Sequence, residues 1–147
     1  MIRFVDLKQQ DKIHKKKILN SIKKILNRTD YINGHDVTKF EETFNKKYNF
    51  KYSSLVSSGT DALYLSLKTL AKKFKSGEII TTPFTFFATS EIIINAGFTP
   101  VFADIDKETY NILPKSISEK INKRTIGIIP VHIFGYPCDM QNIIKIA

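Results

Sequence analysis

Two short segments of the sequence carry residue types suited to holding an anion and a flat ring. The first is Ser57-Ser-Gly-Thr-Asp-Ala-Leu63, where a strand-like pattern gives way to a helical one. The first N–H groups of a helix lack partners within the helix and carry partial positive charge, so Gly59 and Thr60 are placed to cradle a phosphate. The same residues also make an ordinary helix N-cap. The negative charge of Asp61 would repel a phosphate beside it. The Asp61 side chain is instead expected to favour the helix N-terminus or to point away.

The second segment is Thr81-Thr-Pro-Phe-Thr-Phe-Phe-Ala-Thr89, at the end of another apolar strand pattern. Ligands of open α/β sheets gather at the carboxyl ends of the strands. An aromatic side chain there can stack on a planar heterocycle while nearby hydroxyls make polar contacts. Because Phe84, Phe86 and Phe87 cannot all face one ligand, some of them are expected to pack in the core.

Four other polar residues are interpreted as structural. His132 is expected to be a hydrogen-bonded residue of a buried strand, and Asp104 and Asp106 to form a turn rather than a metal or acid–base pair. Cys138 is expected in a loop without a neighbouring histidine that would make it a nucleophile. As the single cysteine, it also excludes an internal disulfide framework and a Cys-rich zinc site.

The first fifty residues are predicted to be helical. Apolar residues recur on one face between Asp11 and Asn27, and a second stripe follows Asp36, which is expected to cap its helix. The stretch 29–35 breaks the period and is predicted as a loop, in which Gly34 is free to adopt positive φ.

From residue 52 the pattern alternates between short strands and helices, which predicts a mainly parallel α/β sheet. The predicted strands are 52–57, 78–82, 99–105 and 125–133. The predicted helices are 60–74, 86–95 with Gly97 at its end, one that begins at Pro114, and one that begins at Asp139.

The composition is that of a globular protein, with 42% hydrophobic residues and no apolar run approaching the roughly 18 to 20 residues of a membrane span. The N-terminal residues do not resemble a signal peptide, so the protein is expected to be cytoplasmic. Of the formal charge of +9, residues 1–60 carry 13 Lys and Arg against 6 Asp and Glu. This excess fits a solvated helix face, attraction of a phosphorylated small molecule, or a basic module that binds nucleic acid.

Seven stretches, taken together and in order, resemble the opening of the DegT/DnrJ/EryC1/StrS aminotransferases, and the similarity runs from Phe4-Val-Asp-Leu7 to the last residue. They are Tyr31-Ile-Asn-Gly34 with Phe40-Glu41; Ser58-Gly-Thr-Asp-Ala-Leu63; Phe84-Thr-Phe-Phe-Ala-Thr89; Ala96-Gly97 with Thr99-Pro-Val-Phe102; Asp104-Ile-Asp106; Thr109-Tyr-Asn111; and Pro130-Val-His-Ile-Phe-Gly135.

The resemblance implies the N-terminal part of the type I fold of aminotransferases that depend on pyridoxal 5'-phosphate (PLP). Residues 1–50 would be a helical segment packing on the large domain, and residues 51–147 the first half of that PLP-binding domain. It implies that Gly59 and Thr60 bind the cofactor phosphate and that Phe86 stacks on the pyridine ring. The parent enzyme would be a homodimer that transfers an amino group, usually from glutamate, to a nucleotide-linked keto-sugar, with no role for nucleic acid or membrane.

In the family, the acidic partner of the pyridine nitrogen and the Schiff-base lysine come later than the position matching Ala147. We therefore expect the chain to be a truncated part of the domain, without catalytic residues and inactive alone. A dehydratase of the same fold, with histidine in place of that lysine, remains an alternative, as does a non-catalytic basic binding module.

Overall fold

The computed structural model describes residues 6–147, so Phe4 and Val5 of the first matching stretch lie outside the described residues. The chain forms two compact units, one ending at Leu55 and the other spanning Val56–Ala147. None of the helices within residues 6–147 combines the length and apolar character needed to cross a bilayer.

The unit that ends at Leu55 contains helices α1 (Leu7–Arg28) and α2 (His35–Tyr48). Helix α1 begins earlier than predicted, because Asp6 rather than Asp11 caps it and accepts a hydrogen bond from the Gln9 N–H at 3.4 Å. On α2 and just after its end, four aromatic rings lie against one another, with centroids 4.7 to 6.4 Å apart. They belong to Phe40, Phe44, Tyr48 and Phe50.

The loop between α1 and α2 shows why residue 34 is glycine, and it corrects the predicted reason. Gly34 has φ −73°, and the positive φ values of this loop are found at Thr29 and Asn33 instead. A Cβ atom on Gly34 would lie 2.1 Å from the carbonyl oxygen of Asp30, closer than atoms can approach. Gly34 also precedes α2 as its N-cap, with Asp36 in the first turn rather than at the cap. Lack of space, not backbone handedness, requires glycine here.

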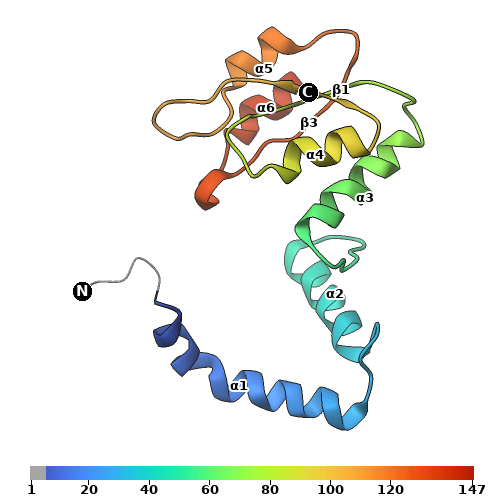
Figure 1. Cartoon of the computed structure of the whole chain (residues 1–147), viewed down its shortest axis with the longest axis vertical. Helices are drawn as coiled ribbons and strands as arrows, with labels where there is room; N and C mark the ends of the chain where they lie inside the picture. The colour runs from blue at the N-terminus through green and yellow to red at the C-terminus, as the bar shows by residue number, and fades with distance from the viewer. Residues whose placement is uncertain (1–5) are drawn as a thin grey trace. The chain divides into compact units, whose positions relative to one another are not determined.

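The second unit is a three-stranded parallel sheet with helices on both faces (Figure 1). The strands are β1 (Glu78–Thr81), β2 (Thr99–Phe102) and β3 (Thr125–Ile128), in the spatial order β2-β1-β3. The helices are α3 (Gly59–Ala71), α4 (Ala88–Asn95), α5 (Pro114–Lys120), the 3₁₀ turn η1 (Ile133–Gly135) and α6 (Met140–Ile146). Helix α5 begins at Pro114 as predicted, and Asp139 caps α6.

Alternate residues of the central strand enter two separate cores. Ile79 packs with α3 and α4, against Leu67, Ile92 and other apolar residues. Ile80 points to the opposite face and packs with α5 and α6, against Ile117, Ile143 and their neighbours. Both isoleucines are fully buried, as expected for a parallel sheet that is covered on both sides. The predicted mainly parallel α/β arrangement is confirmed.

The predicted strand at 52–57 is wrong. No strand forms there among the described residues, and Tyr52 is 79% exposed. The backbone instead hydrogen-bonds to α2, where the Leu55 N–H donates to the Glu41 carboxylate at 2.7 Å. Directly after this segment, Ser58 is already the N-cap of α3.

Two other predicted strands end early. Strand β2 stops at Phe102, ahead of a turn formed by Asp106. Strand β3 stops at Ile128, and the nearby Pro130 has no N–H to continue the ladder.

Candidate functional site

The N-terminus of α3 presents two backbone donors that are free to bind an anion. Ser58 caps the helix, and its Oγ accepts from the Asp61 N–H at 3.1 Å while its carbonyl accepts from the Ala62 N–H at 3.0 Å. Within residues 6–147 the N–H groups of Gly59 and Thr60 have no protein acceptor. A Cβ atom on Gly59 would meet nothing within 4 Å, and Gly59 and Thr60 are both exposed. This arrangement fits a phosphate.

The carboxylate of Asp61 is held by two hydroxyl groups. The Ser57 hydroxyl donates to it, and the Ser58 hydroxyl does so at 3.0 Å. These hydrogen bonds, that of Ser57 first, lower the pKa of Asp61 below its ordinary value. The Asp61 carboxylate therefore holds the two serines that precede α3. This agrees with the expectation that Asp61 favours the helix N-terminus.

Phe86 lies in a tightly bonded loop between β1 and α4. The loop is closed by hydrogen bonds from the Phe84 N–H to Thr82 Oγ1 at 3.1 Å and from the Thr89 N–H to the Phe86 carbonyl at 3.0 Å. Phe86 is 77% exposed and Phe87 71% exposed. The ring of Phe86 is therefore available for stacking on a ligand, and the hydrogen bonds of the loop hold its backbone in place.

The structure brings only part of the predicted site together. Helices α3 and α4 pack against each other, and Thr60 and Asp61 line a hollow with Glu91 of α4. Phe86 does not line that hollow. The assignment of Gly59, Thr60 and Phe86 to a single cofactor site therefore stays a prediction.

Aromatic side chains from the loops after all three strands meet at the carboxyl edge of the sheet. The ring of Phe84 lies 5.8 Å from that of Tyr110 and 6.4 Å from that of Phe134, measured between centroids. Phe84 is 42% exposed and belongs to neither hydrophobic core, so the expectation that some of the three phenylalanines pack in the core is wrong. The only signal in the sequence for Tyr110 and Phe134 was their place in two of the matching stretches, because their contacts to Phe84 span 26 and 50 positions of the chain.

Asn111 was also missed by the sequence reasoning, although it is one of the few buried polar residues. Its side-chain amide donates to the carbonyl oxygens of Tyr136 and Pro137 at 3.0 and 3.1 Å, and its side-chain oxygen accepts from the Ile133 N–H at 3.2 Å. The signal in the sequence was only its place in the Thr109-Tyr-Asn111 stretch. Three bonds to a loop more than 20 residues away are invisible to local pattern reasoning.

The interpretation of His132 and Cys138 needs two corrections. His132 is exposed and follows the end of β3, so it is not in a buried strand. It does lie close to Cys138, because its Nδ1 accepts from the Cys138 N–H at 3.0 Å. The thiol itself donates to the Val131 carbonyl at 3.1 Å, and burial raises the pKa of Cys138. A raised pKa disfavours the thiolate, so Cys138 remains structural.

The acidic pair Asp104 and Asp106 forms the expected turn. Asp106 accepts from the N–H groups of Glu108 and Thr109 at 3.1 and 2.9 Å and from the Thr109 hydroxyl at 2.9 Å. Backbone and side-chain bonds from Thr109 lower the pKa of Asp106. No cluster of three metal-ligating side chains occurs in the part of the chain that the structure describes.

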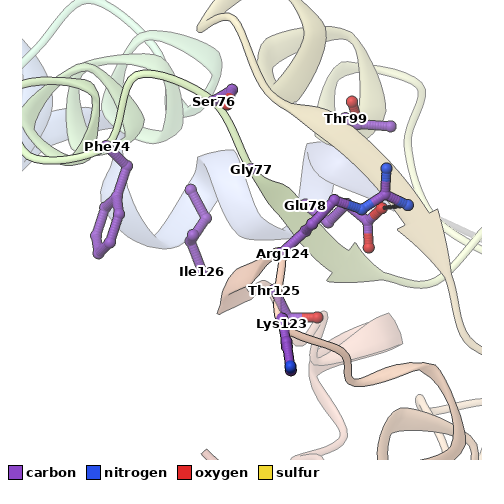
Figure 2. Close-up of a pocket in the computed structure, with 9 residues that line it drawn as sticks. All are labelled: Phe74, Ser76, Gly77, Glu78, Thr99, Lys123, Arg124, Thr125 and Ile126. Atoms are coloured by element: carbon purple, nitrogen blue, oxygen red, sulfur yellow. Dashed lines mark ion pairs between the residues drawn. The ribbon is translucent and has the colours of Figure 1, made fainter.

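A broad hollow at the opposite, amino edge of the sheet has a different character. Figure 2 shows the Arg124 guanidinium against the Glu78 carboxylate, 2.5 Å away. The second carboxylate oxygen of Glu78 accepts from the Asn122 side-chain amide at 2.7 Å. The buried carboxylate is thus fully paired, and a Cβ on Gly77 would lie 2.8 Å from Ile126. These contacts hold the Glu78 carboxylate at the end of the sheet, and the side chains of Ser76, Thr99 and Lys123 also line the hollow.

The comparisons with known proteins agree with this fold and with these sequence motifs. Similar solved structures include the NtdA protein of Bacillus subtilis with bound cofactor PMP, the pyridoxamine phosphate form. It is 32% identical, has a TM-score of 0.83, and is matched over 91% of this chain and 31% of that one. A GDP-4-keto-6-deoxymannose-3-dehydratase is 30% identical with a TM-score of 0.81, over 87% of this chain and 35% of that one. The protein therefore has part of the aminotransferase fold.

The family follows from the sequence match. The profile of the DegT/DnrJ/EryC1/StrS aminotransferase family matches residues 12–147, and the chain belongs to that family. The UDP-2-acetamido-2-deoxy-3-oxo-D-glucuronate aminotransferase of Pseudomonas aeruginosa is 38% identical over the whole of this chain. The chain spans 41% of the length of that relative.

Proposed function

We propose that this chain forms the phosphate-holding part of the PLP domain in a nucleotide-sugar aminotransferase. The observation that carries the proposal is the N-terminus of α3, where the N–H groups of Gly59 and Thr60 have no acceptor among residues 6–147 and both residues are exposed. Membership of an aminotransferase family supports the choice of PLP over other phosphorylated ligands.

In this proposal each of the three predicted residues has a physical role. The N–H groups of Gly59 and Thr60, with the Thr60 hydroxyl, bind the cofactor phosphate, and the exposed ring of Phe86 stacks on the pyridine. When bound, PLP supplies an electron sink for chemistry at an amine-bearing carbon. The residues described here bind and orient the cofactor and move no proton.

The proposed substrate is a nucleotide-linked keto-sugar, with glutamate as the amino donor and a homodimer as the working assembly. The name of the Pseudomonas aeruginosa relative, which acts on a UDP-linked 3-oxo sugar, supports the substrate class. Amino sugars for surface polysaccharides are the expected products.

A dehydratase is the second candidate, supported by the similarity to the GDP-4-keto-6-deoxymannose-3-dehydratase. In the natural coding sequence, a lysine at the cofactor-anchoring position beyond Ala147 would favour the aminotransferase. A histidine at that position would favour the dehydratase. Finding neither would contradict both candidates.

A binding experiment tests the phosphate site directly. We expect this chain to bind pyridoxamine phosphate more tightly than pyridoxamine, as measured by fluorescence titration. Gly59→Ala fills the open face with a methyl group and should weaken binding of the phosphorylated form roughly tenfold or more, as expected for disturbed bonds to a charged group.

Gly127→Ala is the matched control, because a Cβ on Gly127 of β3 also meets nothing within 4 Å. It should leave the affinity unchanged. Equal affinity for the two amines, or equal effects of the two alanine variants, would contradict the proposed site.

A further inference from the structure

Two aromatic residues at the carboxyl edge of the sheet are held in an unfavourable backbone conformation. Tyr110 has φ 60° and Phe134 has φ 54°, in the left-handed region that side chains with a Cβ rarely adopt. Such conformations persist only where the surrounding structure fixes them, and they gather at functional sites. Phe134 is also 84% exposed, so burial of its ring does not explain the conformation.

The side chain of Asn111 connects the backbones next to both of these residues. Asn111 directly follows Tyr110, and its side-chain oxygen accepts from Ile133, the neighbour of Phe134. Its amide donates to the next carbonyls along the same loop, those of Tyr136 and Pro137. Asn111 is 4% exposed, and three of the four hydrogen bonds its carboxamide can make are formed.

The two ends of the 132–137 loop are joined by contacts that do not involve Asn111. The backbone N–H of Cys138 donates to His132, and the Cys138 thiol donates to Val131. The ends of the 132–137 loop are therefore joined through Cys138, and Asn111 bonds the loop on both sides of Phe134, at Ile133 and at Tyr136 and Pro137. The middle of the loop carries Phe134, whose ring meets Phe84.

We propose that Asn111 is a positioning residue that holds the 132–137 loop so that Tyr110 and Phe134 stand beside Phe84 as an aromatic wall of the ligand site. The wall offers stacking surface to a planar ring. It rests on the proposed function in one respect, namely that the carboxyl edge is where the ligand binds.

The positioning role is tested by a tryptophan at position 134, because the chain contains no natural tryptophan. In the F134W background, Asn111→Ala is expected to lower the fluorescence anisotropy of this reporter. It should also increase the rate at which a thiol reagent modifies Cys138 by about tenfold or more, since local opening exposes the buried sulfur. Ser116→Ala is the matched control. It removes another buried hydrogen bond, from the Asp104 N–H to Ser116 Oγ at 2.9 Å, without touching the loop.

N111D separates hydrogen bonding from packing. Aspartate has the shape of asparagine, but it replaces the amide donor with a carboxylate oxygen that faces two carbonyl oxygens. N111D should therefore disturb the reporter more than Asn111→Ala. Because burial raises the pKa of a carboxyl group, protonation at mildly acidic pH restores one donor. Part of the anisotropy should then return in N111D and not in Asn111→Ala.

The outcomes are distinct. If the Asn111 variants change the reporter and the thiol rate no more than Ser116→Ala does, or if N111D shows no recovery in acid, the positioning role is wrong. With the role supported, Asn111→Ala should also weaken the binding of pyridoxamine phosphate, and unchanged affinity would overturn the wall. If the natural sequence does not bind pyridoxamine phosphate at all, the proposed function fails and the wall fails with it, while the reporter still decides whether Asn111 positions the loop.

Discussion

The two edges of the same three-stranded sheet are built on different principles. At the amino edge, the buried Glu78 carboxylate is paired with Arg124 and Asn122, and there is no room for a side chain at Gly77. At the carboxyl edge, aromatic rings are exposed and two residues hold strained backbone angles. The amino edge holds a buried carboxylate by an ion pair and a hydrogen bond, whereas the carboxyl edge keeps its loops fixed and its aromatic rings exposed. The difference indicates that stability and ligand binding can be altered separately in this unit.

The largest expected effect comes from the amino edge. Glu78→Ala should lower the free energy of unfolding by about 1–3 kcal/mol, because the Asn122 amide loses its acceptor and the end of β1 loses its attachment to Arg124. Urea denaturation measures this change. Glu119→Ala is the matched control, since it removes an exposed glutamate from α5. The affinity for pyridoxamine phosphate should stay unchanged in both variants, and a clear loss in Glu78→Ala would break the separation of the two edges.

A smaller effect is expected in the loop after β1. Phe86→Leu should weaken binding of pyridoxamine phosphate roughly three- to tenfold, in keeping with about 0.5–1.5 kcal/mol for an aromatic pair. The free energy of unfolding should change by less than about 0.5 kcal/mol, because the side chain is exposed. Phe87→Leu, equally exposed and adjacent, should bind normally. Equal losses in the two variants, measured by the same titration, would mean that the stacking residue is not Phe86.

The smallest effect concerns Asp61. Its pKa is lowered in the folded chain, so the stabilisation is present above the unfolded value of about 3.9 and is lost as the pH falls through the lower folded value. Ser57→Ala should raise the pKa of Asp61 toward its ordinary value, as followed by NMR titration of the carboxyl carbon. The pKa of Asp139, lowered by Asn142, should not move. A shift of both would indicate a global change instead of the loss of one hydrogen bond.

Much of the fold could be predicted from local patterns. Helix α2 follows from the spacing of apolar residues although its cap was misplaced, α5 follows from Pro114, and the start of α6 follows from Asp139. The strand expected at 52–57 could not be excluded from the sequence, because a strand exists only where a neighbour accepts its backbone. Here the Leu55 N–H is taken by Glu41.

The site divides in the same way. Gly59 and Thr60 were predicted because helix-end chemistry is local, the resemblance to the family selected Phe86 among the aromatic residues, and the structure leaves all three accessible. Asn111 and the pairing of Glu78 could not be predicted, because each depends on a partner 22 to 46 residues distant along the chain.

The strand order β2-β1-β3 has a topological consequence. The loop after the central strand leads to α4 on one face of the sheet, whereas the loops after both outer strands lead to α5 and α6 on the other. Strands β2 and β3 are not neighbours, so the bonds from Asn111 span the end of β1 and join two outer loops over it. Reversals of this kind are where open α/β sheets leave room for ligands. A molecule bound at the end of β1 would therefore lie between two sets of loops. Phe84 belongs to the loop that leaves β1 toward α4, and the two loops joined by Asn111 leave toward α5 and α6.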